Sequence, residues 1–254
     1  MAQFTSDGLS LAYDEFGPRD AKKAIVLVHG FSANRYENWK RMGWYDAIAS
    51  KGLRGVALDN RGHGESDKPH DPAKYSREAM ARDLFALMDH AGVERAHLLG
   101  FSMGSHIALT AALVDSGRID HLVVAGVGAK MFDPPREEGA MAEAMEAASP
   151  DSIADPMLKS FRHFADEQKE DRLALAACSR GARTPLTRDS LMAIRRPTLI
   201  VAGARDQLAG PPQGLADAIA GAKAVTLPGC DHFSCIGHPL FKASVFDFFD
   251  GWLE

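Results

Sequence analysis

Short, unbroken hydrophobic runs alternate with longer amphipathic stretches along most of the chain. Unbroken apolarity over four or five residues indicates strands buried on both faces, as in a parallel sheet. Six such runs lie at residues 24–28, 55–58, 96–99, 121–125, 198–202 and 224–227. The segment before them, residues 4–13, contains Asp7-Gly8 and predicts a hairpin that turns at this dipeptide.

The stretches between these runs predict helices. The clearest covers residues 76–91, with Ser76 in the N-cap position. Leu84 and Leu87 recur on one face of it, and Gly92 follows the last turn. Further helices are expected at residues 39–50, 103–114, 215–219 and 240–253. Strands that alternate with helices predict an α/β fold with a doubly wound, mostly parallel sheet.

The alternation stops between residues 130 and 194, where only helical patterns rich in alanine and methionine occur. A helical excursion between two strands indicates a small cap inserted over the sheet edge at which open α/β folds bind ligands. We therefore expect a core of residues 1–129 and 195–254 and a cap of residues 130–194. Four apolar side chains of the cap are candidates for the substrate pocket, namely Phe132, Met141, Met145 and Phe161.

A G-x-S-x-G pentapeptide at residues 100–104 joins the run at 96–99 to the helix predicted at 103–114. In this strand–turn–helix context the serine sits on a turn so tight that its neighbours two residues away must be small. The turn exposes the hydroxyl, and the N-terminus of the following helix favours negative charge there. The pattern predicts Ser102 as a nucleophile.

A serine hydroxyl is a weak nucleophile without a base, and the chain has ten histidines. His232 follows the last predicted strand and so lies at the same sheet edge as Ser102. His106 is the competitor nearest in sequence, but one turn into the nucleophile's helix its side chain is expected to pack beside that helix. We predict that His232 is the base.

The histidine needs a carboxylate that holds its tautomer. Asp206 follows the strand at 198–202, again at the carboxyl edge of the sheet, whereas the alternative, Asp133, sits beside two prolines at the start of the cap. We predict Asp206. The backbone N–H groups of Met103 and Phe31 are expected to form the oxyanion hole, because Gly30 permits a close turn before Phe31.

A metal site is the alternative for the segment around the base. Cys230, Asp231, His232 and Cys235 lie within six positions of one another. This spacing lacks a second ligand pair and would consume the predicted base, so we expect packing cysteines, no metal and no cofactor.

Composition limits the partners. The 254 residues are 46% hydrophobic and 25% charged, as in an ordinary globular domain, and the net charge is −5 without a basic cluster. Nucleic acid and anionic membranes are therefore not expected to bind. The chain starts without the features of a signal peptide, no apolar run reaches the roughly 18–20 residues of a membrane span, and three cysteines fit a reducing compartment. We expect a cytoplasmic monomer or homodimer.

With these motifs the chain resembles the α/β-hydrolase fold superfamily, in particular its esterase/lactonase-like branch with a short helical cap. The motifs are His-Gly-Phe at 29–31, Arg-Gly-His-Gly-Glu-Ser at 61–66 and the pentapeptide at 100–104, together with Asp206 and His232. The resemblance implies a catalytic triad in the chain order Ser102, Asp206, His232. A serine at this position, where related dehalogenases and epoxide hydrolases have aspartate, implies acyl transfer.

We therefore predict a serine hydrolase that cleaves a small or medium-chain carboxylic ester through an acyl-enzyme. The same residues fit an enol-lactonase, a C–C bond hydrolase, a thioesterase or a perhydrolase. Related C–C hydrolases usually carry tryptophan after the catalytic histidine, where this chain has Phe233. An alternative of another class is a non-catalytic protein of this fold that binds a small molecule.

Overall fold

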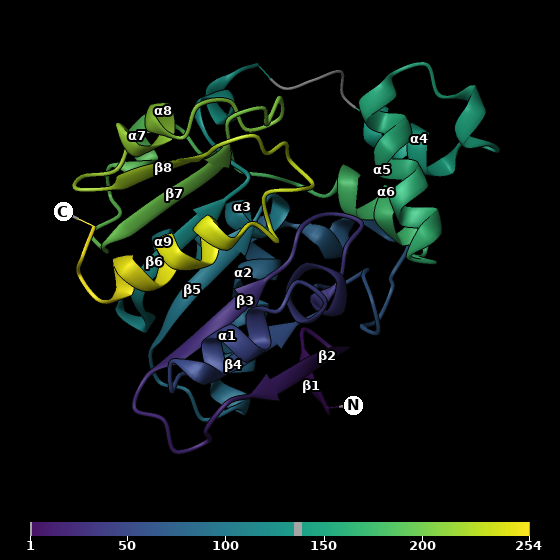
Figure 1. Ribbon diagram of the computed structural model, residues 1–254. Helices are drawn as coiled ribbons and strands as arrows, with labels where there is room; N and C mark the ends of the chain where they lie inside the picture. The colour runs from purple at the N-terminus through teal and green to yellow at the C-terminus, as the bar shows by residue number, and fades with distance from the viewer. Residues whose placement is uncertain (1, 135–138, 254) are drawn as a thin grey trace.

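The computed structural model describes residues 2–134 and 139–253. Within them, an eight-stranded sheet has the order β1-β2-β4-β3-β5-β6-β7-β8 (Figure 1). β1 (Ala2–Ser6) and β2 (Leu9–Phe16) form the expected antiparallel hairpin, and β2 also pairs antiparallel with β4. The remaining strands pair in parallel; they are β3 (Ala24–Val28), β4 (Arg54–Leu58), β5 (Ala96–Phe101), β6 (Ile119–Ala125), β7 (Thr198–Gly203) and β8 (Lys223–Leu227).

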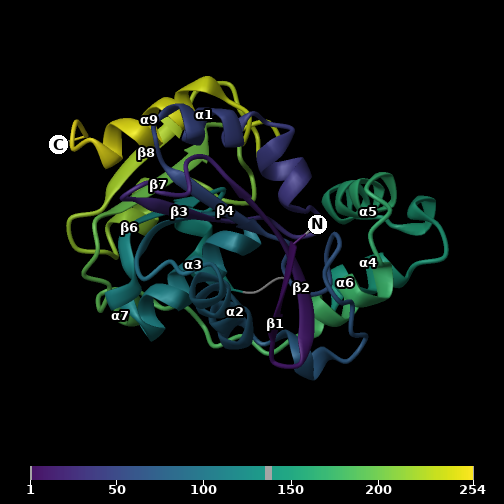
Figure 2. The ribbon, with the colours of Figure 1, turned by 90° about the horizontal axis from the view of Figure 1, so that it is seen from below.

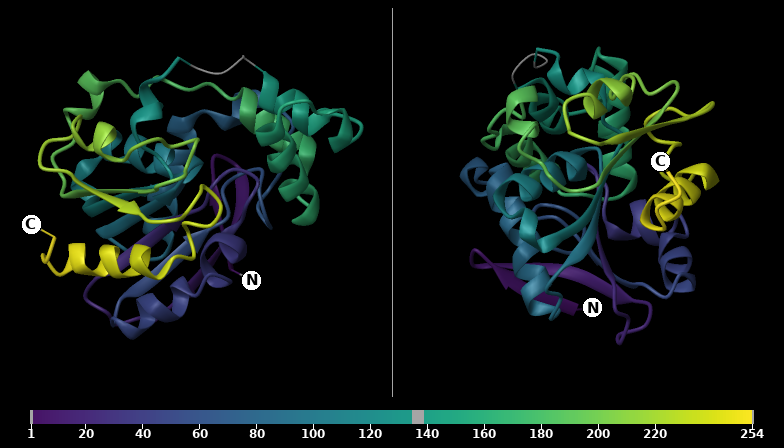
Figure 3. Two further views of the ribbon diagram at one scale, coloured as in Figure 1. Left: turned by 45° about the horizontal axis from the view of Figure 1, so that its top comes forward. Right: turned by 90° about the vertical axis from the view of Figure 1, so that its left-hand side faces the viewer.

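Helices cover both faces of the sheet. α1 (Trp44–Ser50) and α9 (Pro239–Phe249) lie side by side on one face (Figures 1 and 3). α2 (Arg77–His90) and α3 (Met103–Val114) lie on the other (Figure 2), and the short α8 (Gln213–Ala216) contributes to the same core as they do. Because side chains alternate along a strand, Ile25 and Leu27 of β3 face the first pair of helices, and Val26 and Val28 face the second.

Between β6 and β7, the described residues form helices and no strand. α4 (Ala140–Glu146), α5 (Pro156–Glu167) and α6 (Arg172–Arg180) stand together beyond the carboxyl ends of the strands (Figure 1) and share a small core of their own. Short 3-10 turns lie at Ala129–Phe132 and Pro150–Ser152. α7 (Arg188–Leu191) instead buries Leu191 in the core beneath α2 and α3. The division into core and inserted cap stays a prediction.

The doubly wound, mostly parallel sheet is confirmed, and the differences lie at the ends of helices. The helix expected at 39–50 is split into a π-helical turn at Tyr36–Lys40 and α1, because Gly43 between them has a left-handed φ of 73°. α9 ends at Phe249 rather than at 253, since Gly251 is left-handed too and closes the helix. No helix among the described residues has both the length and the apolar character that a bilayer span requires.

Candidate active site

Ser102 stands on a strained turn between β5 and α3. Its φ of 51° and ψ of −114° lie in a region that side chains other than glycine rarely adopt. Two glycines make the turn possible, because a Cβ on Gly100 would lie 2.4 Å from the Gly104 carbonyl oxygen. A Cβ on Gly104 would lie 2.1 Å from the Val28 carbonyl oxygen of β3. The close approach presents the Ser102 hydroxyl at the end of the strand and at the N-terminus of α3.

Gly104→Ala is expected to destabilise the fold by about 3 kcal/mol, because the added methyl group collides with backbone atoms that cannot move aside. The midpoint of urea unfolding measures the loss. Gly237→Ala is the matched control: its Cβ would meet only the flexible end of Met42, at 3.1 Å, so a change below about 1 kcal/mol is expected. Equal stability of the two variants would show that α3 can shift away from β3.

The structure brings the three predicted catalytic side chains into one hydrogen-bonded row. His232 Nε2 lies 3.0 Å from Ser102 Oγ, and His232 Nδ1 lies 2.8 Å from Asp206 Oδ2. The residues follow β5, β7 and β8, whose carboxyl ends meet at one sheet edge. Asp206 and His232 are both buried, with exposed fractions of 4% and 6%. A hydroxyl, an imidazole and a carboxylate in this order can move a proton from the hydroxyl to the ring.

The Asp206 carboxylate is held from two sides. Its Oδ1 accepts hydrogen bonds of 2.9 Å from the backbone N–H groups of Leu208 and Ala209, while Oδ2 faces His232. Burial acts to raise the pKa of Asp206, but the hydrogen bond and charge of His232, together with the two N–H groups, outweigh burial and lower that pKa. The group is therefore a fixed anion at neutral pH.

The two predicted oxyanion donors belong to Met103, which directly follows Ser102, and to Phe31, which lines both cavities that contain Ser102. Among the hydrogen bonds of the described residues, the N–H groups of Phe31 and Met103 have no acceptor within the protein. The loop before Phe31 is braced, because Gly30 N–H donates to Asn38 Oδ1 at 2.8 Å. His29 Nε2 accepts from Asn60 N–H at 2.9 Å, which leaves Nδ1 to donate to the Gly30 carbonyl at 2.7 Å. The role of these two N–H groups as oxyanion donors stays a prediction.

The alternatives weighed from the sequence occupy other places. His106 is not hydrogen-bonded to Ser102 through its ring, and burial, with the charges of Arg77 and Arg183, lowers its pKa to about 3. Asp133 is exposed at the end of a 3-10 turn. The thiols of Cys230 and Cys235 donate to backbone carbonyls. Within the described residues, no group of three or more His, Cys, Asp or Glu side chains is placed to hold a metal ion.

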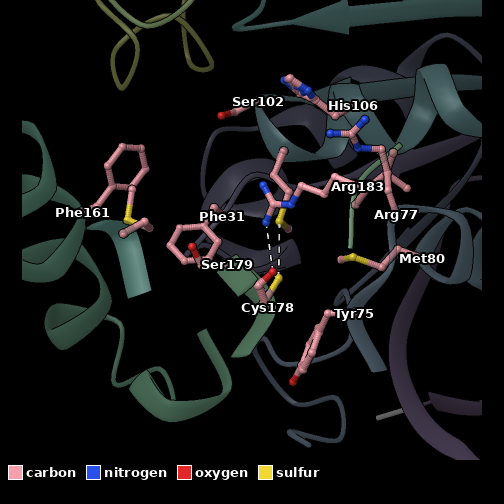
Figure 4. A pocket seen from close by; sticks show the side chains of 13 residues that line it. Phe31, Tyr75, Arg77, Met80, Ser102, His106, Phe161, Cys178, Ser179 and Arg183 are labelled. Carbon is pink, nitrogen blue, oxygen red and sulfur yellow. Dashed lines mark hydrogen bonds between the residues drawn. The ribbon is translucent and has the colours of Figure 1, made fainter. Parts of the chain in front are cut away.

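Two cavities meet at Ser102, with Phe31 and Phe161 between them. The first, here the arginine cavity, measures about 260 Å³ and reaches along α3 past His106 to Arg77 and Arg183 (Figure 4). The second, here the phenylalanine cavity, measures about 400 Å³ and contains His232. Its aromatic and aliphatic wall is formed by Phe101, Phe161, Phe164, Phe233, Met42 and Ile236.

Two of the four predicted pocket residues line these cavities: Phe161 lines both, and Met141 lines the arginine cavity. The other two require correction. Met145 is fully buried in the small core of α4, α5 and α6, because it points between these helices. Phe132 packs against the core on the α2/α3 face, with the Arg188 guanidinium 4.2 Å above its ring, and lines neither cavity.

Sequence reasoning missed the polar end of the arginine cavity. Arg77, His106 and Arg183 come from α2, α3 and the segment after α6. One signal was available: Arg77 is the first residue of a helix, where the helix dipole favours acidic rather than basic side chains. This signal does not single out Arg77, because Arg172 and Arg188 begin α6 and α7 in the same way and line neither cavity.

The fold and the geometry around Ser102 are those of α/β-hydrolases, and comparisons with known proteins agree. The family model described as alpha/beta hydrolase fold matches residues 23–184. The 3-oxoadipate enol-lactonase 1 of Acinetobacter baylyi is 32% identical over 218 residues, which cover 78% of this chain and 77% of that protein. The chain belongs to the α/β-hydrolase family, and this membership supports a hydrolytic function.

Two further comparisons define the range of similar proteins. The crystal structure of the enol-lactonase from Burkholderia xenovorans LB400 has a TM-score of 0.81 and 25% identity, and the match covers 98% of this chain and 100% of that one. The 2-hydroxy-6-oxononadienedioate/2-hydroxy-6-oxononatrienedioate hydrolase of Paraburkholderia phymatum is 36% identical over 136 residues, or 52% of this chain and 46% of its own length. Several other curated relatives align over only 30% to 41% of their length.

Proposed function

We propose that this protein is a serine hydrolase that cleaves a small or medium-sized carboxylic ester through an acyl-enzyme. The observation that carries the proposal is the pair of hydrogen bonds made by His232, 3.0 Å to Ser102 and 2.8 Å to Asp206. Ser102 acts as nucleophile, His232 as base and Asp206 as the group that orients the ring.

In the first half of the reaction, Ser102 Oγ attacks the carbonyl carbon while His232 Nε2 takes the hydroxyl proton. The carbonyl oxygen becomes an oxyanion that accepts hydrogen bonds from the N–H groups of Phe31 and Met103. When the intermediate collapses, the bond to the leaving oxygen breaks and His232 returns the proton to the departing alcohol. In the second half, water repeats these steps on the acyl-enzyme and releases the acid.

The cavities limit the substrate to a small molecule. Small-molecule sites usually measure roughly 300–1,000 Å³. The arginine cavity, at about 260 Å³, lies below this range, and the phenylalanine cavity, at about 400 Å³, lies near its lower end. A lactonase is the second candidate, because an enol-lactonase is similar to this chain over 78% of its length. A lactone is a cyclic ester, so the same residues would open it by the same steps.

Other reactions of this machinery are weaker candidates. Phe233, which lines the phenylalanine cavity next to His232, stands where related C–C bond hydrolases carry tryptophan. Thioester hydrolysis and perhydrolysis would use the same three side chains, and no residue described here favours them over ester cleavage. A protein that only binds would not need the strained Ser102 turn, which costs about 1–3 kcal/mol.

The test is hydrolysis of p-nitrophenyl esters from acetate to laurate. We expect kcat/KM to peak at short or medium acyl chains and to fall at least about tenfold at laurate, because the cavities that meet at Ser102 measure only about 260 and 400 Å³. Labelling by a fluorophosphonate reports a reactive serine independently of the substrate. Labelling without turnover of any ester in the series would favour a lactone, C–C or thioester substrate, and the absence of both would favour the binding protein.

A further inference from the structure

One end of the arginine cavity is cationic. Arg77 and Arg183 both line it, and Figure 4 shows them with His106 on the side of the cavity opposite Phe161. The backbone holds the two arginines close together, since Arg77 donates through its N–H to the Ala182 carbonyl and through its guanidinium to the Thr184 carbonyl at 2.9 Å. Arg183 donates to the Cys178 carbonyl at 2.9 Å.

Arg77 is partly buried and Arg183 is exposed, and their partners differ from those of the fully buried arginines. Arg35, Arg61 and Arg162 are buried, and each forms an ion pair, with Asp59, Asp83 and Asp166 respectively. Within residues 2–134 and 139–253, neither Arg77 nor Arg183 has a carboxylate within ion-pair distance. Glu78 acts on Arg77 only through its charge, and its carboxylate is hydrogen-bonded to Thr184.

The electrostatics at this end of the cavity favour a bound anion. Burial, followed by repulsion from Arg183, lowers the pKa of Arg77 to about 10, so the Arg77 guanidinium remains charged at neutral pH. The neutral His106 ring beside them has a buried Nδ1 with no partner among the described residues. Two guanidinium groups and one imidazole together offer several unused N–H donors, and guanidinium matches the geometry of a carboxylate.

The position of His232 decides which part of the substrate enters each cavity. The leaving oxygen must lie beside His232 Nε2 to receive its proton, and His232 lines the phenylalanine cavity. The alcohol part therefore occupies the phenylalanine cavity, whose lining includes Glu37, Arg41 and Glu167 beside the aromatic side chains. The acyl chain turns past Met103 into the arginine cavity, at whose far end lie Arg77 and Arg183.

We propose that the arginine cavity binds a carboxylate at the end of the acyl chain. The preferred substrates are then half-esters of short dicarboxylic acids, or lactones that carry a carboxylate on the acyl side. This inference rests on the proposed function, because it names the substrate class of the same site. Neutral esters of equal length react through the same triad but lose the contacts with the two arginines.

The test compares monobenzyl glutarate with benzyl valerate, in which a methyl group replaces the carboxylate, by measuring release of benzyl alcohol. We expect kcat/KM to be at least about tenfold higher for the glutarate. Arg77→Gln and Arg183→Gln should each lower kcat/KM for the glutarate by about 10- to 100-fold, the range for loss of a charged hydrogen bond, and change it less than about twofold for the valerate. Arg82→Gln and Arg180→Gln, at exposed positions of α2 and α6 outside the cavity, are the matched controls.

Several outcomes would overturn the proposal. Equal rates for the two esters in the wild-type protein would mean that the cavity does not recognise a carboxylate. Equal losses on both esters in the arginine variants would assign these residues a structural role. A preference for 4-carboxybenzyl valerate over monobenzyl glutarate would place the carboxylate on the alcohol side.

A binding measurement separates this proposal from the proposed function. Glutarate, but not valerate, should raise the Tm of the wild-type protein, and the shift should vanish in Arg77→Gln and Arg183→Gln. Glutarate binding without hydrolysis of any ester would overturn the proposed function and leave the carboxylate site supported. Ester hydrolysis without glutarate binding and without preference for the half-ester would support the proposed function and overturn the carboxylate site.

Discussion

Ser102→Ala is expected to lower kcat for ester hydrolysis by about 10⁶-fold, the scale found when a triad nucleophile is removed from a serine protease. The methyl group cannot form the acyl-enzyme, and His232 loses the hydroxyl that its Nε2 contacts at 3.0 Å. Binding and the oxyanion donors remain, so the residual rate should exceed that in water alone. Turnover of a p-nitrophenyl ester and labelling by a fluorophosphonate should disappear together.

Ser179→Ala is the control for this change, because Ser179 lines the arginine cavity without contacting His232. It should keep fluorophosphonate labelling and change kcat by less than about tenfold. Circular dichroism of the Ser102→Ala protein should match that of the wild type, since the strained turn is held by Gly100 and Gly104 rather than by the serine side chain. Retained turnover in a folded Ser102→Ala protein would mean that the nucleophile is elsewhere.

The sheet could be predicted from the sequence because its strands are short and apolar, and because helices with recognisable capping residues separate them. β3 begins and ends at the residues expected from the run Ala24–Val28, and Ser76 caps α2 as expected, accepting a hydrogen bond from Ala79 N–H. The three side chains of the proposed triad could be chosen because each lies in the loop that follows a strand. The carboxyl ends of parallel strands meet at one edge, so position along the chain already indicates proximity in space.

The cavities could not be predicted in this way, because helix periodicity shows which residues are apolar but not which neighbour they face. Met141 and Met145 both lie on α4, one turn apart; the first lines the arginine cavity and the second fills the core between α4, α5 and α6. Arg77 and Arg183 are brought together by hydrogen bonds of Arg77 to the segment 182–184, more than one hundred residues away. Such a contact has no local signal apart from the cation in the first turn of α2, a feature that α6 and α7 share.

Asp206→Asn is expected to lower kcat by about 10⁴-fold with little change in the fold, the scale of the same substitution in the serine-protease triad. The two sides of this carboxylate explain why. The N–H groups of Leu208 and Ala209 require an acceptor at Oδ1, so the asparagine oxygen takes that place and its NH₂ group faces His232. His232 Nδ1 must then accept, which leaves the ring proton on Nε2, where it points at Ser102. A ring in that tautomer cannot act as the base.

Asp133→Asn provides the matched control, because Asp133 is the other carboxylate considered for this role and is exposed. It should leave kcat within about twofold of the wild type. The tautomer argument also predicts how the loss divides: kcat should fall while KM stays nearly constant, because the substrate contacts in both cavities are unchanged. A large loss in Asp133→Asn, or a loss in Asp206→Asn carried mainly by KM, would show that Asp206 does not orient the base and that another carboxylate does.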